Sequence, residues 1–175
     1  FNDFLILSPY GLFVINVLQS EGNIYSTKGL FSGEWVQTVP EKNELNKIDN
    51  PFKRNYMYMK NLKKILNKGL FGRNFFRLPN DYPVYSLVVC NDELKFRMER
   101  YEDRWSDLNG ALLHLSEIED YFSTIQQGRG INLKSKHIET IKQTIEQERL
   151  DGLLKIKRVI AENKQKDNKY IDLAV

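Results

Sequence analysis

Apolar and polar residues along this chain follow two periods, and the strand-like period comes first. Residues 3–7 (DFLIL) and 12–18 (LFVINVL) are rich in β-branched and aromatic side chains. They flank SPYG, whose proline in the second position and glycine in the fourth suit a type I turn. The opening stretch therefore predicts a hairpin. Similar short runs predict three further strands, at residues 22–26, 84–89 and 110–115.

A helix-like period interrupts these strands from Pro51 to about Lys68. Apolar residues recur there at the spacing of one helix face, at positions 52, 56, 59, 62 and 66. Because strands in series are interrupted by helices, the sequence predicts an α/β domain.

Helical spacing returns after the last predicted strand. Ser116 and Glu119 have the spacing of a capping box, which predicts a helix that runs to about Ile125. Apolar residues at 133, 138, 141 and 145, and again from 153 to 160, predict one or two helices near the C-terminal end. We therefore expect an α/β domain at residues 1–130 and a helical extension packed on it at 131–175. Two short stretches, 39–51 and 126–132, have the composition of linkers.

The turn sets the register of the hairpin. If Ser8 opposes Gly11, each residue i opposes residue 19 − i, and Asp3 lies across from Asn16. Cross-strand partners have Cβ atoms roughly 5 Å apart. Side chains alternate along a strand, so Leu18 points to the same face as Asn16. An acid, an amide and a leucine are thus expected to converge on one side of the sheet.

Charge is distributed unevenly. Residues 51–80 carry eight basic residues and no acid, whereas the other 145 residues carry 18 basic and 23 acidic ones. On the predicted helix, several of these lysines fall within about 80° of one another, opposite much of the apolar face. Aromatic residues at 56, 58, 71, 75 and 76 are interleaved with them. This mixture suits phosphate contacts and base stacking, although a charge run can equally be a solvated face. The candidate nucleic-acid-binding residues are Lys53, Arg54, Lys60, Lys63, Lys64 and Lys68.

The sequence shows few signals of thiol chemistry, zinc binding, nucleotide binding or membrane insertion. The single cysteine, Cys90, lies in an apolar run and is expected to be a buried structural thiol. His114 and His137 have no cysteine or histidine partners at zinc-like spacing. Glycine-rich nucleotide-binding motifs are absent, and no run of about 18 apolar residues or signal peptide is visible. We therefore expect a cytoplasmic protein that needs no membrane.

The string FNDFLILSPYGLFVINVLQSEGNIY, followed by EWVQ and then NPFKRNYMYMKNLKKIL, resembles the nuclease-related domain (NERD) family of the PD-(D/E)xK superfamily. The resemblance covers roughly residues 1–90 and, more loosely, 91–145. It implies a restriction-endonuclease-like core with a mixed central sheet flanked by helices. The residues that fit the family pattern are Asp3, Ser8, Pro9, Gly11, Phe13, Val14, Ile15, Gly22, Ile24, Trp35, Asn50 and Pro51.

The resemblance also implies three catalytic positions, which fall on Asp3, Asn16 and Leu18. In a metal-dependent phosphodiesterase these positions carry two carboxylates that hold the ion and a lysine that stabilises the transition state. Only Asp3 retains its chemistry and could ligate a metal, and a family glutamine is replaced by Arg54. We expect a catalytically impaired nuclease that binds nucleic acid, rather than an active enzyme, and we expect no cofactor. The resemblance also places a helix and a strand of the family before Phe1.

Two alternatives stay open. The chain could be an active Mg²⁺-dependent DNA nuclease whose missing groups come from elsewhere, with Lys28, Glu21, Glu34 and Asp49 within reach in sequence. It could instead be a protein-interaction module of a larger assembly. In either case the apolar strand at 3–7 would have an open edge, which proteins normally cover. We therefore expect upstream residues, a second copy or a partner protein against that edge.

Overall fold

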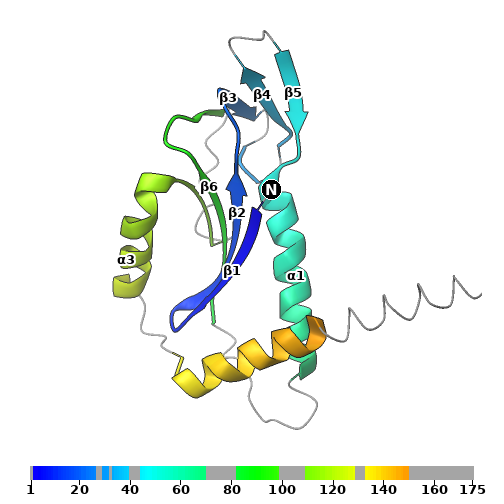
Figure 1. Cartoon of the computed structure of the whole chain (residues 1–175), viewed down its shortest axis with the longest axis vertical. Helices are drawn as coiled ribbons and strands as arrows, with labels where there is room; N and C mark the ends of the chain where they lie inside the picture. Colours follow the sequence, from blue (N-terminus) through cyan, green and yellow to red (C-terminus); the bar gives the residue numbers. More distant parts are fainter. Residues whose placement is uncertain are drawn as a thin grey trace, which may run out of the picture.

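The computed structural model describes residues 2–26, 29–31, 33–39, 44–69, 82–98, 109–128 and 133–149. It confirms the predicted α/β class: helices flank two mixed sheets of four strands each (Figure 1). The elements are β1 (Asn2–Ser8), β2 (Gly11–Leu18), β3 (Asn23–Ser26), β4 (Trp35–Val39), β5 (Glu44–Ile48), α1 (Pro51–Gly69), β6 (Val84–Cys90), β7 (Lys95–Met98), β8 (Gly110–His114), the 3₁₀ helix η1 (Leu115–Glu117), α3 (Ile118–Gly128) and a helix at 135–149.

The chain passes from the first sheet into the second twice, from β2 into β3 and from β6 into β7. The first has the order β1-β2-β6-β8, in which only the β1–β2 pair is antiparallel. The second has the order β5-β4-β3-β7 and begins a few residues beyond the ends of β2 and β6. Gly22, at φ 84°, allows the first of these bends, and its carbonyl accepts a 3.3 Å bond from the Lys95 amide across the gap. Of this second sheet, the sequence predicted only β3.

The predicted hairpin register is confirmed over the whole of β1 and β2. Ser8 pairs with Gly11 and Asp3 pairs with Asn16. The Ser8 hydroxyl also accepts the Tyr10 amide at 3.1 Å, which stabilises the turn. At Gly11, a Cβ would lie 2.6 Å from the Tyr85 ring, so the close approach of β6 requires glycine there.

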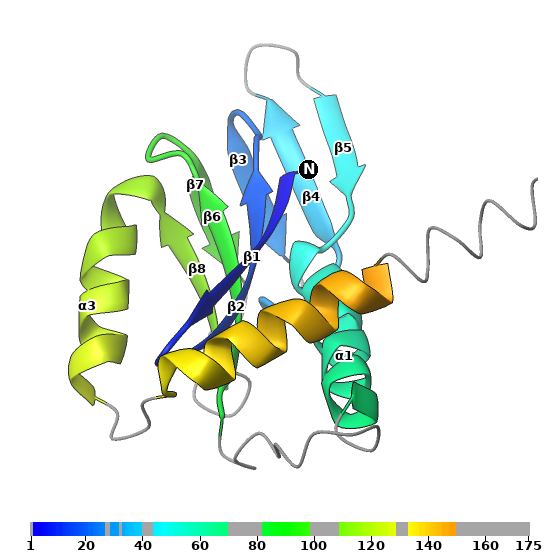
Figure 2. The same cartoon turned by 60° about the horizontal axis from the view of Figure 1, so that its bottom comes forward.

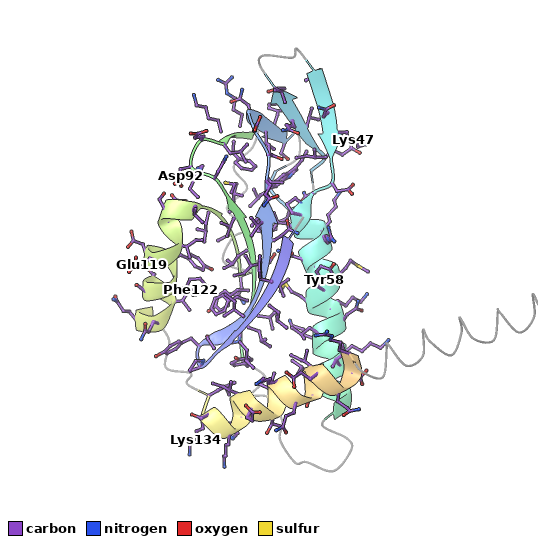
Figure 3. All side chains as sticks on the ribbon, in the orientation of Figure 1. Lys47, Tyr58, Asp92, Glu119, Phe122 and Lys134 are labelled. Atoms are coloured by element: carbon purple, nitrogen blue, oxygen red, sulfur yellow. The ribbon has the colours of Figure 1, made fainter. Side chains whose placement is uncertain are left out.

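Helices cover both faces of the first sheet, with α1 on one side and α3 on the other (Figures 1 and 2). Leu12 and Val14 face α1, where Leu62 and Leu66 complete a core cluster. Phe13 faces α3 and meets Phe122 edge-on, with ring centroids 4.7 Å apart (Figure 3). Each side of β2 is therefore core, which matches its continuous apolar sequence.

Helix α1 starts where the sequence places it, and Asn50 explains why. Its side-chain oxygen accepts the Phe52 amide at 2.9 Å, as an N-cap does, and Pro51 occupies the first helical position. The same side chain donates to the carbonyls of Leu30 and Gly33 at 2.9 and 3.0 Å. One asparagine thus joins the helix start to the loop before β4.

The predicted buried face of α1 is wrong at one position. Tyr56 is 59% exposed, and Asn55 is the residue buried between Phe52 and Met59. The spacing of apolar residues did not predict the burial of Asn55, because an asparagine is polar and yet can be buried when its amide is hydrogen-bonded.

The capping box predicted at Ser116 is also wrong. The Ser116 amide and hydroxyl both donate to Asp92, at 3.0 and 2.8 Å, and these bonds lower the pKa of that carboxyl group. Glu117 instead accepts the His114 amide at 2.7 Å, two residues before the predicted pair. Helix α3 therefore begins behind a short 3₁₀ turn and extends to Gly128.

The helix at 135–149 crosses the lower end of the first sheet and α1 in the view of Figure 2. Leu133 and Ile141 belong to the same buried cluster as Leu12 and Leu62. The Leu133 amide also donates to the Pro9 carbonyl in the hairpin turn, at 3.0 Å. The helix predicted at 153–160 lies outside the described residues, and the domain division at residue 130 stays a prediction. The stretch at 39–51, read as a linker, contains β5, so that interpretation is wrong.

Candidate nuclease-related site and nucleic-acid interface

The three positions that the resemblance implies as catalytic lie on neighbouring strands, towards the carboxyl end of β2. Asp3 lies directly across from Asn16 on β1, and Leu18 follows one pleat further along. Asn16 is fully buried. The Asp3 side chain lies outside the described part of the structure, so its backbone position alone is established.

Leu18 has become part of the hydrophobic core. It packs in a buried cluster with Trp35, Phe52 and Val88, where the two sheets meet the start of α1. A lysine at this position would stabilise developing negative charge, whereas a leucine has no polar group to do so. Leu18 therefore contributes to the packing of the core and not to the stabilisation of charge.

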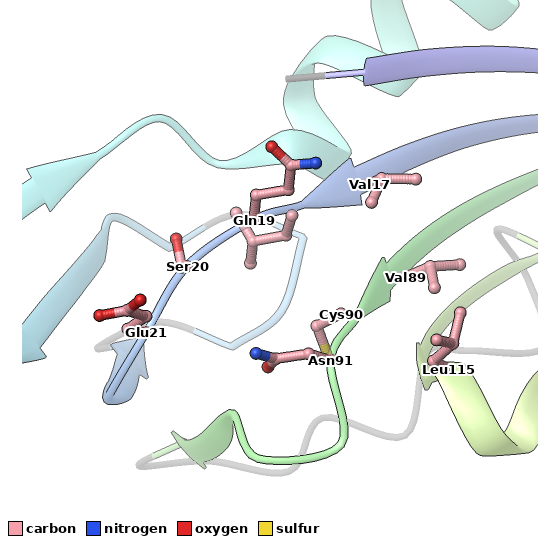
Figure 4. A pocket seen from close by; sticks show the side chains of 9 residues that line it. Val17, Gln19, Ser20, Glu21, Val89, Cys90, Asn91 and Leu115 are labelled. Carbon is pink, nitrogen blue, oxygen red and sulfur yellow. The ribbon is translucent and has the colours of Figure 1, made fainter.

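A pocket of about 330 Å³ lies beside Leu18, between the ends of β2 and β6 (Figure 4). Its walls are mostly apolar and include Val17, Val89 and Leu115. Glu21 also lines it, but Figure 4 shows the carboxylate at the far end of the group, away from Val17 and Val89. Leu18 thus lines this pocket whereas Asn16 does not, and the carboxylate of Glu21 lies at its edge.

Cys90 closes the same pocket and is the buried thiol that the sequence predicts. Its Sγ donates to the Leu113 carbonyl at 3.4 Å. Burial, together with the nearby carboxylates of Glu117 and Asp92, raises the pKa of the thiol to about 11. A thiol with that pKa is protonated at neutral pH and is a poor nucleophile or metal ligand.

The described residues do not form a site for the Mg²⁺ ion that the nuclease alternative requires. Across the described ranges, no three histidine, cysteine or acidic side chains lie together as metal ligands. Asn16 can offer one neutral oxygen and Leu18 none, whereas Mg²⁺ prefers carboxylates. The residues at the family's positions therefore do not fit the ion.

The groups considered as replacements are dispersed. Glu34 pairs with Lys47 at 2.7 Å between β4 and β5, where both side chains are largely exposed. Asp49 is exposed just before α1, and Lys28 lies outside the described residues. His114 contacts the Asn91 carbonyl at 3.1 Å through Nδ1. Apart from Glu21, then, no described candidate lines the pocket beside Leu18.

The basic residues of α1 form an exposed ridge. Lys53, Lys60 and Lys64 lie within about 40° of one another around the helix, on the side opposite the buried Asn55 and Leu62. Lys63 and Arg54 are exposed on the two flanks. Within the described ranges none of the four lysines forms an ion pair. We call Lys53, Arg54, Lys60, Lys63 and Lys64 the basic ridge; the Lys68 side chain and residues 70–81 lie outside the description.

Arg54, which falls where the resemblance implies a glutamine, contacts Tyr58. Its Nε donates to the Tyr58 hydroxyl at 3.2 Å, and its guanidinium lies 5.8 Å from the centre of that ring. Tyr58 is exposed and lines a hollow between α1 and the β1–β2 hairpin. The contact presents a cation and an aromatic ring together, a combination used for binding nucleic-acid strands.

Sequence reasoning missed a buried polar cluster under the ridge. The Asn55 Nδ2 lies 3.0 Å from the Leu87 carbonyl, 3.1 Å from Ser86 Oγ and 3.3 Å from the Val14 carbonyl. These acceptors belong to β2 and β6, so one amide attaches α1 to two central strands. The only available signal was an asparagine at the helical spacing of Phe52, Leu62 and Leu66.

The α/β fold with its mixed sheets is consistent with a restriction-endonuclease-like core. The family model of the nuclease-related domain, NERD, matches residues 2–91, just over half of the chain. The chain belongs to this family, as the sequence predicts. No significant match was found among curated proteins or among solved structures. Among the described helices, none is both long and apolar enough to cross a membrane.

Proposed function

We propose that this chain is a catalytically impaired nuclease-related domain that binds nucleic acid through the basic ridge of α1. The observation that carries the proposal is the ridge itself: exposed lysines in line on one helix, with no acidic residue in that helix. Family membership gives the nuclease-related character.

The loss of catalysis follows from the site at the end of β2. A buried asparagine and a buried leucine stand where the reaction needs a second carboxylate and a cation. One remaining acid cannot hold and neutralise a divalent ion well. An active Mg²⁺-dependent DNA nuclease would need those groups from another chain or from residues beyond the described ones.

Binding through the ridge should be tolerant of sequence, because lysines contact phosphates and carry little base information. Each phosphate neutralised adds roughly −0.9 for a duplex, or −0.7 for a single strand, to the slope of log K against log salt. Affinity should therefore fall steeply with salt. DNA is the expected ligand, and a cytoplasmic location and the absence of a required cofactor belong to the same proposal.

Fluorescence anisotropy with labelled oligonucleotides at several salt concentrations tests the proposal. The variant Lys60→Glu with Lys64→Glu reverses the centre of the ridge and should reduce both the affinity and the slope. Its control, Lys134→Glu with Lys136→Glu, makes the same charge change at exposed positions around the start of the helix at 135–149. Figure 3 labels Lys134 at the lower left, to the side of α1. Equal loss in both pairs would show that only net charge matters.

A protein-interaction module is the competing function. It is favoured if the wild-type protein binds no oligonucleotide even at low salt. In that case the basic ridge is only a solvated face.

A further inference from the structure

A cavity of about 520 Å³ opens between α1 and the β6–β8 side of the first sheet, next to the basic ridge. Its lining is mainly aromatic and thioether side chains, together with two lysines and two small polar residues. The lining residues are Phe31, Phe52, Lys53, Tyr56, Met57, Met59, Lys63, Val84, Ser86 and Asn109. A half-open apolar cavity of this size with a few polar groups is typical of a ligand site.

Phe31 forms one wall of the cavity, and its ring position is set by the residues that it contacts. A Cβ at Gly110 would lie 2.6 Å from Cε1 of Phe31, so the glycine lets the ring lie directly on the start of β8. The ring also meets Phe52 edge-on, with centroids 4.7 Å apart. Asn109, at φ 46°, adopts the left-handed conformation that turns the chain into β8. Phe31 is thereby held as a fixed face of the cavity.

A buried hydroxyl group lies on the inner wall. Ser86 is only 5% exposed, and its Oγ accepts the Asn55 amide at 3.1 Å. Among the described residues, no hydrogen-bond acceptor for the Ser86 hydroxyl proton is present. The hydroxyl can therefore donate to a ring nitrogen or carbonyl of a molecule in the cavity.

The rim is positively charged. Lys53 and Lys63 line the cavity and are exposed, and Lys53 also belongs to the line of lysines along α1. Among the described residues that line the cavity, none is acidic. A strand whose phosphates follow the basic ridge would thus pass its bases close to the cavity opening.

We propose that this cavity receives one unpaired base of a nucleic-acid strand bound along the basic ridge, and the inference rests on the proposed function. The aromatic faces suit a planar heteroaromatic ring, the Ser86 hydroxyl suits its polar edge, and the two lysines suit the adjoining phosphates. Bases inside a duplex are stacked and paired, so the site selects single strands or extruded bases.

The test uses two short single-stranded probes of equal charge. One is a fully abasic backbone, and the other carries a single 2-aminopurine on the same backbone. Wild-type protein should bind the probe with the base about five-fold or more tightly, and should quench its fluorescence through stacking. The variant Tyr56→Ala removes an exposed ring of the cavity and should abolish both effects, with duplex affinity unchanged.

The variant Tyr10→Ala is the matched control, because Tyr10 lies in the turn between β1 and β2, is not part of the basic ridge and does not line this cavity. It should keep the preference for the base. Salt-sensitive binding of both probes with equal affinity would overturn the base site and leave the proposed function standing. If neither probe nor a duplex binds at low salt, the proposed function fails and the base site fails with it.

Discussion

Replacing Asn55 by alanine should strongly destabilise the fold. The side chain is fully buried and its amide lies close to three acceptors on β2 and β6. The contacts at 3.0 and 3.1 Å are good hydrogen bonds, and each contributes about 1 kcal/mol net. The 3.3 Å contact adds less, and the cavity left by the side chain adds about 1 kcal/mol. The loss is therefore about 3 kcal/mol.

Urea unfolding followed by circular dichroism measures this loss. With a slope of roughly 2 kcal/mol per molar urea, a loss of 3 kcal/mol lowers the midpoint by about 1.5 M. Asn61→Ala is the control, because Asn61 is an exposed asparagine of the same helix and should change stability by less than about 0.5 kcal/mol. If both variants shift the midpoint equally, the buried amide does not attach α1 to the sheet as described.

Three further predictions concern the nuclease-related positions, the thiol and the sheet edge. Asn16→Glu combined with Leu18→Lys should raise the affinity for Mn²⁺, measured by calorimetry. No gain in affinity would argue that residues 16 and 18 do not lie close to Asp3. Native Cys90 should resist thiol reagents. The free energy of unfolding should fall as the pH rises from 9.0 towards about 11, because in that range the thiol ionises in the unfolded protein and stays protonated in the folded one. Cys90→Ala should reduce that fall. The edge strand β1, on which Phe4, Leu5 and Ile6 are exposed, should cause self-association that light scattering detects, and Leu5→Lys should prevent it. Concentration-independent monomers would contradict this.

The elements predicted from sequence are those whose signals are local. The SPYG turn determined the hairpin register, and the Asn50–Pro51 cap determined the start of α1. The outer strands were missed because their exposed positions carry mixed polar residues: β5, for example, reads ELNKI, and Leu45 is 74% exposed. Their pairing partners, rather than their own composition, make them strands.

The candidate sites likewise include features that the sequence could predict and features that it could not. Convergence of positions 3, 16 and 18 follows from the alternation of side chains and could be predicted. The polar cluster of Asn55 and Ser86 could not, because it joins residues 31 positions apart that meet only in the folded sheet. The cavity beside it requires Phe31 to lie on Gly110, a contact between a loop residue and the start of β8 that no sequence period predicts.

The central claim is that this nuclease-related domain binds nucleic acid without cleaving it. The most direct measurement incubates the protein with labelled duplex DNA and Mg²⁺, at a salt concentration where anisotropy shows a complex, and then resolves the DNA on a denaturing gel. The account predicts bound and intact DNA. Reproducible cleavage by the wild type that disappears in Asp3→Ala would contradict it.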